Sequence, residues 1–139
     1  MITGRWFPEG EPPAEAIRLW SDVFAWDQDG WDEFTRRNGF ARAVGVFDPA
    51  GRLAAAGRMY YLDGAFWLEA LAVRADSRRQ GYGDLLARMM LDRALRHAAR
   101  VIRLASAGEC AGFFERYGFE QANDGVMMVE AENVKFHQS

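Results

Sequence analysis

The feature that most constrains this chain is a junction near its middle, where a strand-like segment leads through a short basic turn into the longest helical pattern. Residues 65–73 alternate as a β-strand does. We expect Trp67, Glu69, Leu71 and Val73 on one face of that strand and Phe66, Leu68, Ala70 and Ala72 on the other. From Gly83 to about Arg100, apolar residues recur at helical spacing and form one broad apolar stripe. A strand followed so closely by such a helix indicates a sheet with the helix packed against it.

The rest of the chain adds strands and helices around this junction. Helices are predicted after Pro13 as far as a stop at Asp27-Gln28-Asp29-Gly30, and then over residues 31–37 and 109–117. Strands are predicted over residues 2–6, 41–47, 53–62, 101–105 and 126–129. Turn signals at residues 48–51 and 63–64 indicate that residues 41–73 form an antiparallel meander. This order predicts an α+β (mixed α/β) layer fold in a single domain, residues 1–139.

Composition limits the class of protein. The chain has 139 residues, 50% of them hydrophobic and 27% charged, as expected for one packed domain. A net charge of −3 argues against a broad nucleic-acid-binding face. Cys110 is the only cysteine, which excludes an internal disulfide and, with two histidines, argues against a multi-ligand zinc site. No apolar run approaches the ~20 residues that span a bilayer, and the first residues lack a signal-peptide core. We therefore expect a cytoplasmic protein with no membrane or nucleic-acid partner.

The junction itself has the properties of an anion-binding site. Its turn reads Arg78-Arg79-Gln80-Gly81-Tyr82-Gly83-Asp84, and the helix begins within it. The first N–H groups of a helix have no intrahelical partner and lie at the positive end of its dipole. Glycines let the backbone approach phosphate oxygens closely, and arginines add charge and forked donors. The sequence therefore predicts a site for a phosphate or pyrophosphate group.

Two common phosphate motifs do not fit this turn. It lacks the Gly-Lys-Ser/Thr of an ATP-binding P-loop. A dinucleotide fingerprint is also poor, because Leu86 stands where a third small residue is needed and Arg103 stands where a ribose-binding acid is needed.

The pattern of Val73 followed by Arg78-x-x-Gly81-x-Gly83 resembles the acetyl-CoA signature of the GNAT-superfamily N-acetyltransferases. Farther along, residues 113–119 (FFERYGF) resemble the family's aromatic-Tyr-Glu-Lys-x-Gly-Phe segment near the C-terminus. The likeness covers roughly residues 42 to 120, and the predicted order of elements matches as well. Either motif alone is a weak signal, whereas the two together in this order are a strong one.

The resemblance implies how acetyl-CoA binds. In GNAT enzymes the fourth strand splays away from the fifth, and the pantetheine arm enters the gap. Its amides pair with the strand backbone, here Leu71, Ala72 and Val73. The pyrophosphate lies on backbone N–H groups of the loop, here Arg79, Gln80, Gly81, Tyr82, Gly83 and Asp84. Arg78 matches the first basic position of the signature.

The resemblance also implies direct transfer of the acetyl group from the thioester to a primary amine. A base must take the proton of the amine. Glu69, just before the pantetheine segment, stands where family members often carry a water-linked general base. The residue types alone leave another interpretation open, in which Glu69 faces solvent or an arginine.

The chain departs from the family at the position of the general acid. The tyrosine that protonates the leaving thiolate aligns with Phe114, and the asparagine that often starts the same helix aligns with Ala107. Either the thiolate leaves unaided or another donor serves, and the candidates are Tyr60, Tyr61 and Tyr82. The same departure favours a second hypothesis, a non-catalytic acetyl-CoA-binding or regulatory domain. A generic nucleotide-phosphate binder is a third.

The acceptor is the least constrained part. Acidic residues outnumber basic ones in residues 1–35, which fits either a rim that attracts a cationic amine or a solubilising surface. Trp20, Trp26 and Trp31 are expected in the core, with some lining the acceptor cleft. Cys110 is expected to be a small packed residue, not a nucleophile. The expected partners are acetyl-CoA and a small amine, and a homodimer is left open.

Overall fold

Seven strands form one sheet in the order β1-β2-β3-β4-β5-β7-β6. The computed structural model describes residues 1–105, 111–123 and 125–136. The strands are β1 (Thr3–Trp6), β2 (Ala41–Phe47), β3 (Leu53–Leu62), β4 (Ala65–Val73), β5 (Val101–Leu104), β6 (Glu120–Gln121) and β7 (Met127–Glu130). The helices are α1 (Ala14–Phe24), α2 (Gln28–Thr35), α3 (Tyr82–Arg96) and α4 (Ala111–Glu115), with 3₁₀ turns at Ala75–Ser77 and Ala131–Asn133. Only the β4–β5 pair is parallel among these strands, so the predicted α+β fold is confirmed.

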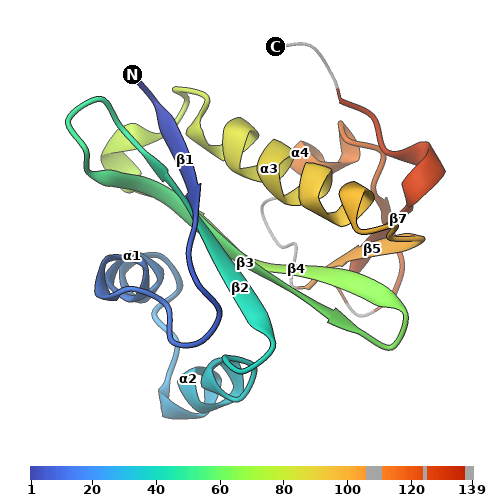
Figure 1. Ribbon diagram of the computed structural model, residues 1–139, viewed down its shortest axis with the longest axis horizontal. Coiled ribbons are helices and arrows are strands. Elements are labelled where there is room, and N and C mark those ends of the chain that lie inside the picture. The colour runs from blue at the N-terminus through green and yellow to red at the C-terminus, as the bar shows by residue number, and fades with distance from the viewer. Residues whose placement is uncertain (106–110, 124, 137–139) are drawn as a thin grey trace.

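Helices cover both faces of the sheet, and each face has its own apolar core. α1 and α2 lie on one face and α3 on the other (Figure 1). The α3-side core includes Leu68, Leu86 and Met90, and the α1-side core includes Trp20 and Phe34. Each large apolar side chain buried in this way contributes roughly 1.5–3 kcal/mol to folding. The two cores hold the sheet between them and fix the direction of β4.

The strand predictions of the meander are confirmed, and several helix ends differ from prediction. The bounds of β2, β3 and β4 agree with those predicted. Asp27 was expected to stop the first helix, but its side chain accepts the Gly30 N–H at 2.9 Å and caps the start of α2. α1 ends earlier, where Ala25 adopts a left-handed φ of 48°. α3 stops at Arg96, short of the predicted end, and Ala98 follows with a left-handed φ of 60°.

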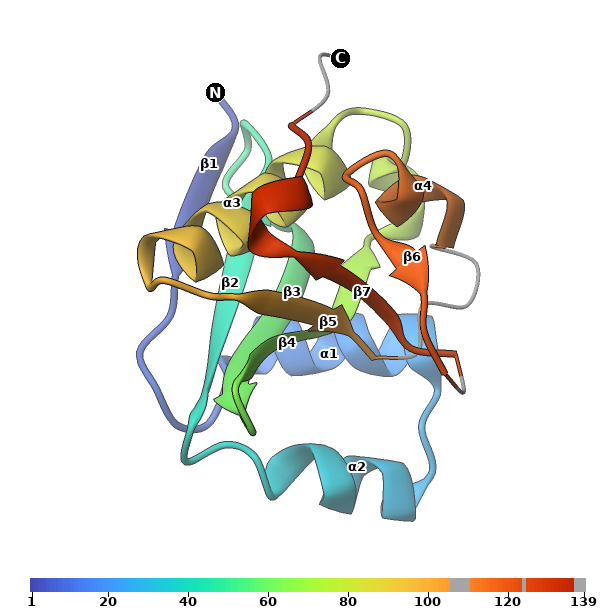
Figure 2. The ribbon, with the colours of Figure 1, turned by 90° about the vertical axis from the view of Figure 1, so that its right-hand side faces the viewer.

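β4 separates from β5 along its second half, as the resemblance implied. Residues Ala65–Leu68 pair with Val101–Leu104, and the Ala105 N–H donates to the Leu68 carbonyl at 3.1 Å. No pairing of residues 69–73 with β5 occurs within the described part of the chain. In Figure 2, β4 leads on to the turn before α3, whereas β5 runs toward the side of α4. The expected splay of the fourth and fifth strands is therefore confirmed.

Candidate active site

The separated edge of β4 directs backbone groups into the gap beside β5. The Arg74 N–H donates to the Ala54 carbonyl of β3 at 2.7 Å, so the backbone of Arg74 faces β3. Backbone groups of successive strand residues face opposite sides. The amides of Val73 and Leu71 therefore face the gap, and that of Ala72 between them faces β3. This edge offers the kind of partner that an extended ligand with its own amides needs.

β4 carries a β-bulge at the point where the gap opens. Arg58 pairs with Glu69 and Ala56 pairs with Ala72, so two residues of β4 lie opposite Gly57 alone. Ala70, the first of these two, has a left-handed φ of 57°. A non-glycine residue in this conformation costs about 1–3 kcal/mol and persists only where its surroundings hold it.

The bulge overturns the predicted division of β4 into two faces. Leu71 and Val73 were expected beside Trp67 and Glu69, but they pack on the α3-side core with Phe66 and Leu68. Ala70 and Ala72 pack on the α1-side core. The extra residue reverses the alternation after Glu69, because side chains in a strand alternate with a period of two.

The basic turn follows the 3₁₀ turn Ala75–Ser77 and leads to the first turn of α3. Arg78, Arg79 and Gln80 are exposed, and Arg79 and Gly81 have left-handed φ values of 63° and 86°. Gly81 is the N-cap of α3 and provides no side-chain hydrogen bond. The N–H groups of Tyr82 and Gly83 therefore begin the helix without a side-chain cap. This geometry fits the predicted phosphate site.

The carboxylate of Asp84, also in the first turn of α3, accepts hydrogen bonds from two other side chains. One of its oxygens accepts the Tyr117 hydroxyl, and the other accepts Arg88 Nε at 2.9 Å. Burial, and next the hydrogen bond to Asp84, raise the pKa of Tyr117 well above its ordinary value. The Tyr117 phenol is therefore a neutral donor that ties α4 and the turn after it to the start of α3.

A half-buried arginine, Arg74, braces the chain between β4 and the basic turn. Arg74 donates from its guanidinium to the Leu53 carbonyl at 2.7 Å, to Ser77 Oγ at 2.8 Å and to Asp48 Oδ2 at 3.0 Å. The Arg52 N–H, and next Arg74, lower the pKa of Asp48. These contacts fix where the turn begins relative to the sheet.

Glu69, the predicted base, lies in a cluster of charges on the α1 side of the sheet. Its side chain is 8% exposed. Oε2 accepts Arg58 Nε at 2.8 Å and Oε1 accepts the Arg37 guanidinium at 2.8 Å. Arg58 is fully buried, lies over the Phe34 ring, and also donates to Asn38 Oδ1 at 2.7 Å. Glu69 therefore joins β3, β4 and the segment after α2, and an approaching amine or water meets a carboxylate whose two oxygens are already engaged.

Phe114 lies on α4 within the α3-side core and is 1% exposed. Its ring contacts those of Phe113, Phe119 and Tyr117 at centroid distances of 5.1, 5.3 and 6.3 Å. The vacant acid position is thus filled by an apolar ring in an apolar setting.

The three candidate acids lie in different places. Tyr60 and Tyr61 pair with Trp67 and Phe66 on the part of β4 that is still joined to β5, and Tyr82 is the buried first residue of α3. Ala107 and Cys110 lie outside the described residues.

The tryptophans expected in the core form an aromatic cluster on the α1 side of the sheet. Trp20 is fully buried, whereas Trp26 and Trp31 are half-buried and in contact with each other at 4.9 Å. Trp26 also stacks on Phe24 at 4.9 Å. The acidic residues of this region are all exposed: Glu9, Glu11, Glu15, Asp22, Asp27, Asp29, Asp32 and Glu33.

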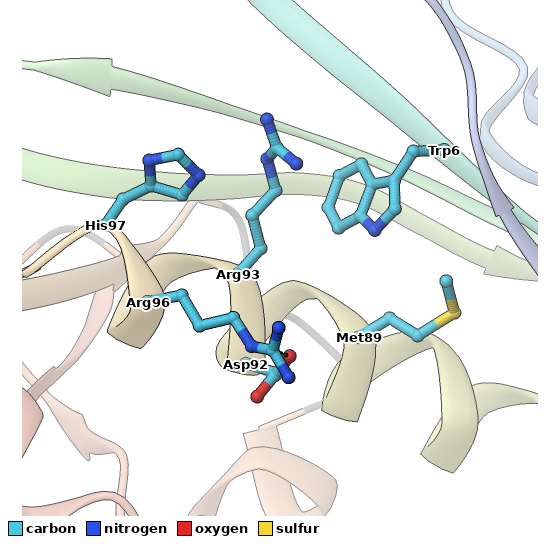
Figure 3. Close-up of a pocket in the computed structure, with 6 residues that line it drawn as sticks. All are labelled: Trp6, Met89, Asp92, Arg93, Arg96 and His97. Atoms are coloured by element: carbon cyan, nitrogen blue, oxygen red, sulfur yellow. Dashed lines mark ion pairs between the residues drawn. The ribbon is translucent and has the colours of Figure 1, made fainter.

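A groove of about 440 Å³ lies elsewhere, between β1 and α3 (Figure 3). Arg93 lies over the Trp6 ring at 4.7 Å, and Asp92 and Arg96 pair across one helical turn at 2.8 Å. This groove borders neither the gap beside β4 nor the basic turn.

Sequence reasoning missed the residues that hold the site together. A signal existed for Arg58, since it is a lone charge in an apolar strand and Glu69 is the lone charge in the next one. Buried charges are almost always paired. No comparable signal marked Arg37, Arg74 or the indole of Trp20.

Two classes of site do not occur in the described parts of the chain. No group of three His, Cys, Asp or Glu side chains that could hold a metal ion is found among residues 1–105, 111–123 and 125–136. Over the same ranges, no helix is long and apolar enough to cross a membrane.

The sequence and the fold were compared with known protein families and solved structures. The sequence model of the acetyltransferase (GNAT) family matches residues 5–119. An acyl-CoA N-acyltransferase from Pseudomonas aeruginosa superposes with a TM-score of 0.74 at 18% identity, over 92% of this chain and 99% of that one. The ribosomal-protein-S18-alanine N-acetyltransferase from Escherichia coli gives 0.73 at 18% identity, over 94% of each chain.

A GNAT family acetyltransferase from Elizabethkingia anophelis, solved with acetyl-CoA bound, gives a TM-score of 0.71 at 13% identity, over 93% of this chain and 97% of that one. No curated protein matches the sequence. The structural likenesses, all of low identity, show the fold.

Proposed function

Because the chain belongs to the acetyltransferase (GNAT) family, enzymes that use acetyl-CoA, we propose that it transfers the acetyl group of acetyl-CoA directly to a primary amine of a small-molecule acceptor. One observation carries the proposal: the open edge of β4 leads through the 3₁₀ turn Ala75–Ser77 into the basic turn at the start of α3. An extended pantetheine arm and a pyrophosphate need these two features, in that order, along one path.

Acetyl-CoA is proposed to lie along this path, with its pyrophosphate at the basic turn and its acetyl group at the bulge of β4. The pyrophosphate lies on backbone N–H groups from Arg79 to Asp84, with the exposed Arg78 adding charge. The pantetheine arm runs back along β4 past Val73, Ala72 and Leu71. The acetyl end then reaches the bulge at Ala70, which is the end of the open edge away from the turn.

The chemical step forms one bond and breaks another. The amine nitrogen attacks the thioester carbonyl, the carbon–sulfur bond breaks, and CoA leaves as a thiolate. A protonated amine first gives one proton to the base; a second proton leaves the nitrogen as the amide forms, and the thiolate takes up one proton. We keep Glu69 as the candidate base because it directly precedes the bulge. An oxygen of the Glu69 carboxylate becomes accessible to the amine only if one of the two guanidinium groups moves away from it. Arg37 is the more exposed of these two partners.

A small cationic acceptor is supported by the charge of the N-terminal region. Eight acidic side chains of residues 1–35 are exposed, against the exposed Arg5 and Arg18. Such a surface raises the local concentration of an amine that is protonated at neutral pH. The half-buried Trp26 and Trp31 lie on the same side of the sheet as Glu69 and offer apolar walls.

Phe114 favours one alternative, a domain that binds acetyl-CoA without turnover. The ring supplies no proton to a leaving thiolate, and the hydroxyl of the neighbouring Tyr117, whose ring centroid lies 6.3 Å away, is engaged by Asp84. A cytoplasmic location and a homodimer also stay predictions.

Two measurements separate these functions. Calorimetry tests binding of acetyl-CoA, and a thiol assay then follows CoA release against a panel of polyamines, aminoglycosides, amino acids and peptides with free N-termini. Binding with release for one acceptor class supports the proposed enzyme. Binding without release across the panel supports the alternative, and absence of binding contradicts both.

A further inference from the structure

We propose that Trp20 is a positioning residue for acetyl transfer: its indole N–H holds the β4 bulge that aims the strand's amides at the acetyl end of acetyl-CoA. The inference rests on the proposed function, because it requires that acetyl-CoA lie along β4. It adds a role for a residue of α1 that contacts neither the turn nor the gap.

The contact itself is specific. Trp20 is 0% exposed and comes from the middle of α1, on the face of the sheet opposite α3. Its Nε1–H donates to the Ala70 carbonyl at 2.7 Å and lies 3.4 Å from the Ala56 carbonyl of β3. The indole ring is held edge-on against Phe34, with ring centroids 5.0 Å apart. One side chain thus links a helix to both strands at the bulge.

The bulge needs such a partner for two reasons. Ala70 is an alanine in a left-handed conformation, which is unfavourable without support from its surroundings. Ala70 is also paired with no residue of β3, and a carbonyl shielded from water and left without a donor is destabilising. The Trp20 indole satisfies that carbonyl and so favours the bulged form over a regular strand.

The consequence for acetyl-CoA follows from the register. With the bulge, the amides of Leu71 and Val73 face the gap and their side chains pack on the α3-side core. Without it, a slip of one residue would turn both amides toward β3. The bulge lies at the far end of the open edge from the phosphate turn, so its position affects the acetyl end most and the pyrophosphate end least.

The test compares acetyl-CoA with CoA, which share every contact except those of the acetyl group, and needs no acceptor. Trp20→Phe keeps an aromatic ring and removes the donor. In this variant, acetyl-CoA is expected to bind about tenfold more weakly relative to CoA than it does in the wild type. A tenfold change corresponds to about the free energy of one hydrogen bond. The affinity for CoA alone is expected to change less than about twofold, because the phosphate turn is unaltered.

Trp31→Phe is the matched control. Trp31 belongs to the same aromatic cluster, and its indole makes no hydrogen bond recorded within the described parts of the chain. The same loss of volume there should leave the ratio unchanged. If Trp20→Phe does not fold, the benzothienyl isostere at position 20 keeps the ring shape and lacks the N–H, and the same shift is expected.

The outcomes are distinguishable. A wild-type protein that binds neither CoA nor acetyl-CoA contradicts the proposed function and the inference with it. A wild-type protein that binds both, with an unchanged ratio in Trp20→Phe or in the isostere, overturns the positioning role alone. Equal losses for both ligands also overturn it, since they indicate a general effect on the fold. A selective loss for acetyl-CoA supports it.

Discussion

Replacing Glu69 with glutamine is expected to destabilise the protein strongly, whatever its effect on catalysis. The carboxylate is 8% exposed and accepts N–H donors from Arg58 and Arg37. Arg58 is itself 1% exposed, so the variant leaves a buried guanidinium without its anion. Glutamine keeps one acceptor oxygen but directs an NH₂ group at a cation.

The size of the effect follows from the burial of the pair. Removing one partner of a buried ion pair costs about 3–5 kcal/mol. Because glutamine retains one acceptor, we expect the lower end, about 3 kcal/mol. For a domain of this size that loss lowers the melting temperature by about 10 °C.

The assay is urea unfolding of wild type, Glu69→Gln and a control, Glu33→Gln. Glu33 also pairs with Arg37, at 3.2 Å, but its side chain is 61% exposed. Exposed pairs contribute about 0.2–1 kcal/mol, so the control should lie within that range of wild type. Equal stability of the two variants would refute the argument from burial.

The same variant separates a structural role from a catalytic one. If Glu69 is also the base, turnover falls by about 10²–10⁴-fold at a temperature where the variant is fully folded. A folded variant with near wild-type turnover shows that Glu69 takes no part in the chemistry and only joins β3, β4 and the segment after α2.

Three other predictions follow from the site. Gly81→Ala should weaken acetyl-CoA binding in calorimetry, because a left-handed alanine costs about 1–2 kcal/mol and shifts the helix start; Gly64→Ala, at a similar φ of 83° in the turn between β3 and β4, should bind normally. Phe114→Tyr should raise kcat about tenfold by supplying a proton to the thiolate, equivalent to ~1.4 kcal/mol, and a fall in kcat would contradict this. The lowered pKa of Asp48 stabilises the fold above the ordinary aspartate pKa, and that stability is lost as pH falls through the lowered value. Acid unfolding should therefore be less steep for Asp48→Asn, and parallel curves would exclude a role for the Arg74 brace.

The sheet and the phosphate turn were predictable because their signals are local. Alternation and turn residues define β2, β3 and β4 within a few neighbouring positions, and the glycines and arginines before α3 are adjacent in sequence. The positive φ of Gly81 needed no tertiary information, since glycine is the residue that adopts it freely.

The geometry around Glu69 was not predictable in this way. Arg37 is 32 residues from Glu69 and Trp20 is 50 residues from Ala70 along the chain. No local sequence signal indicated the bulge either, because an alanine occupies the left-handed position where glycine is the usual signal. Simple alternation therefore placed Leu71 and Val73 on the wrong face.

The bulge couples the two faces of the sheet, and this limits how the N-terminal region can vary. Glu69 and Ala70 are consecutive residues directed to the α1 side, where Arg37 and Trp20 hold them. The next amide in the gap belongs to Leu71, whose side chain packs on the α3-side core. Apart from Glu33, which pairs with Arg37, the exposed acidic residues of α1 and α2 make no ion pair with these groups and are free to change with the acceptor. The buried face of α1 cannot change as freely, because a shift of Trp20 would move the strand that the acetyl group is proposed to follow.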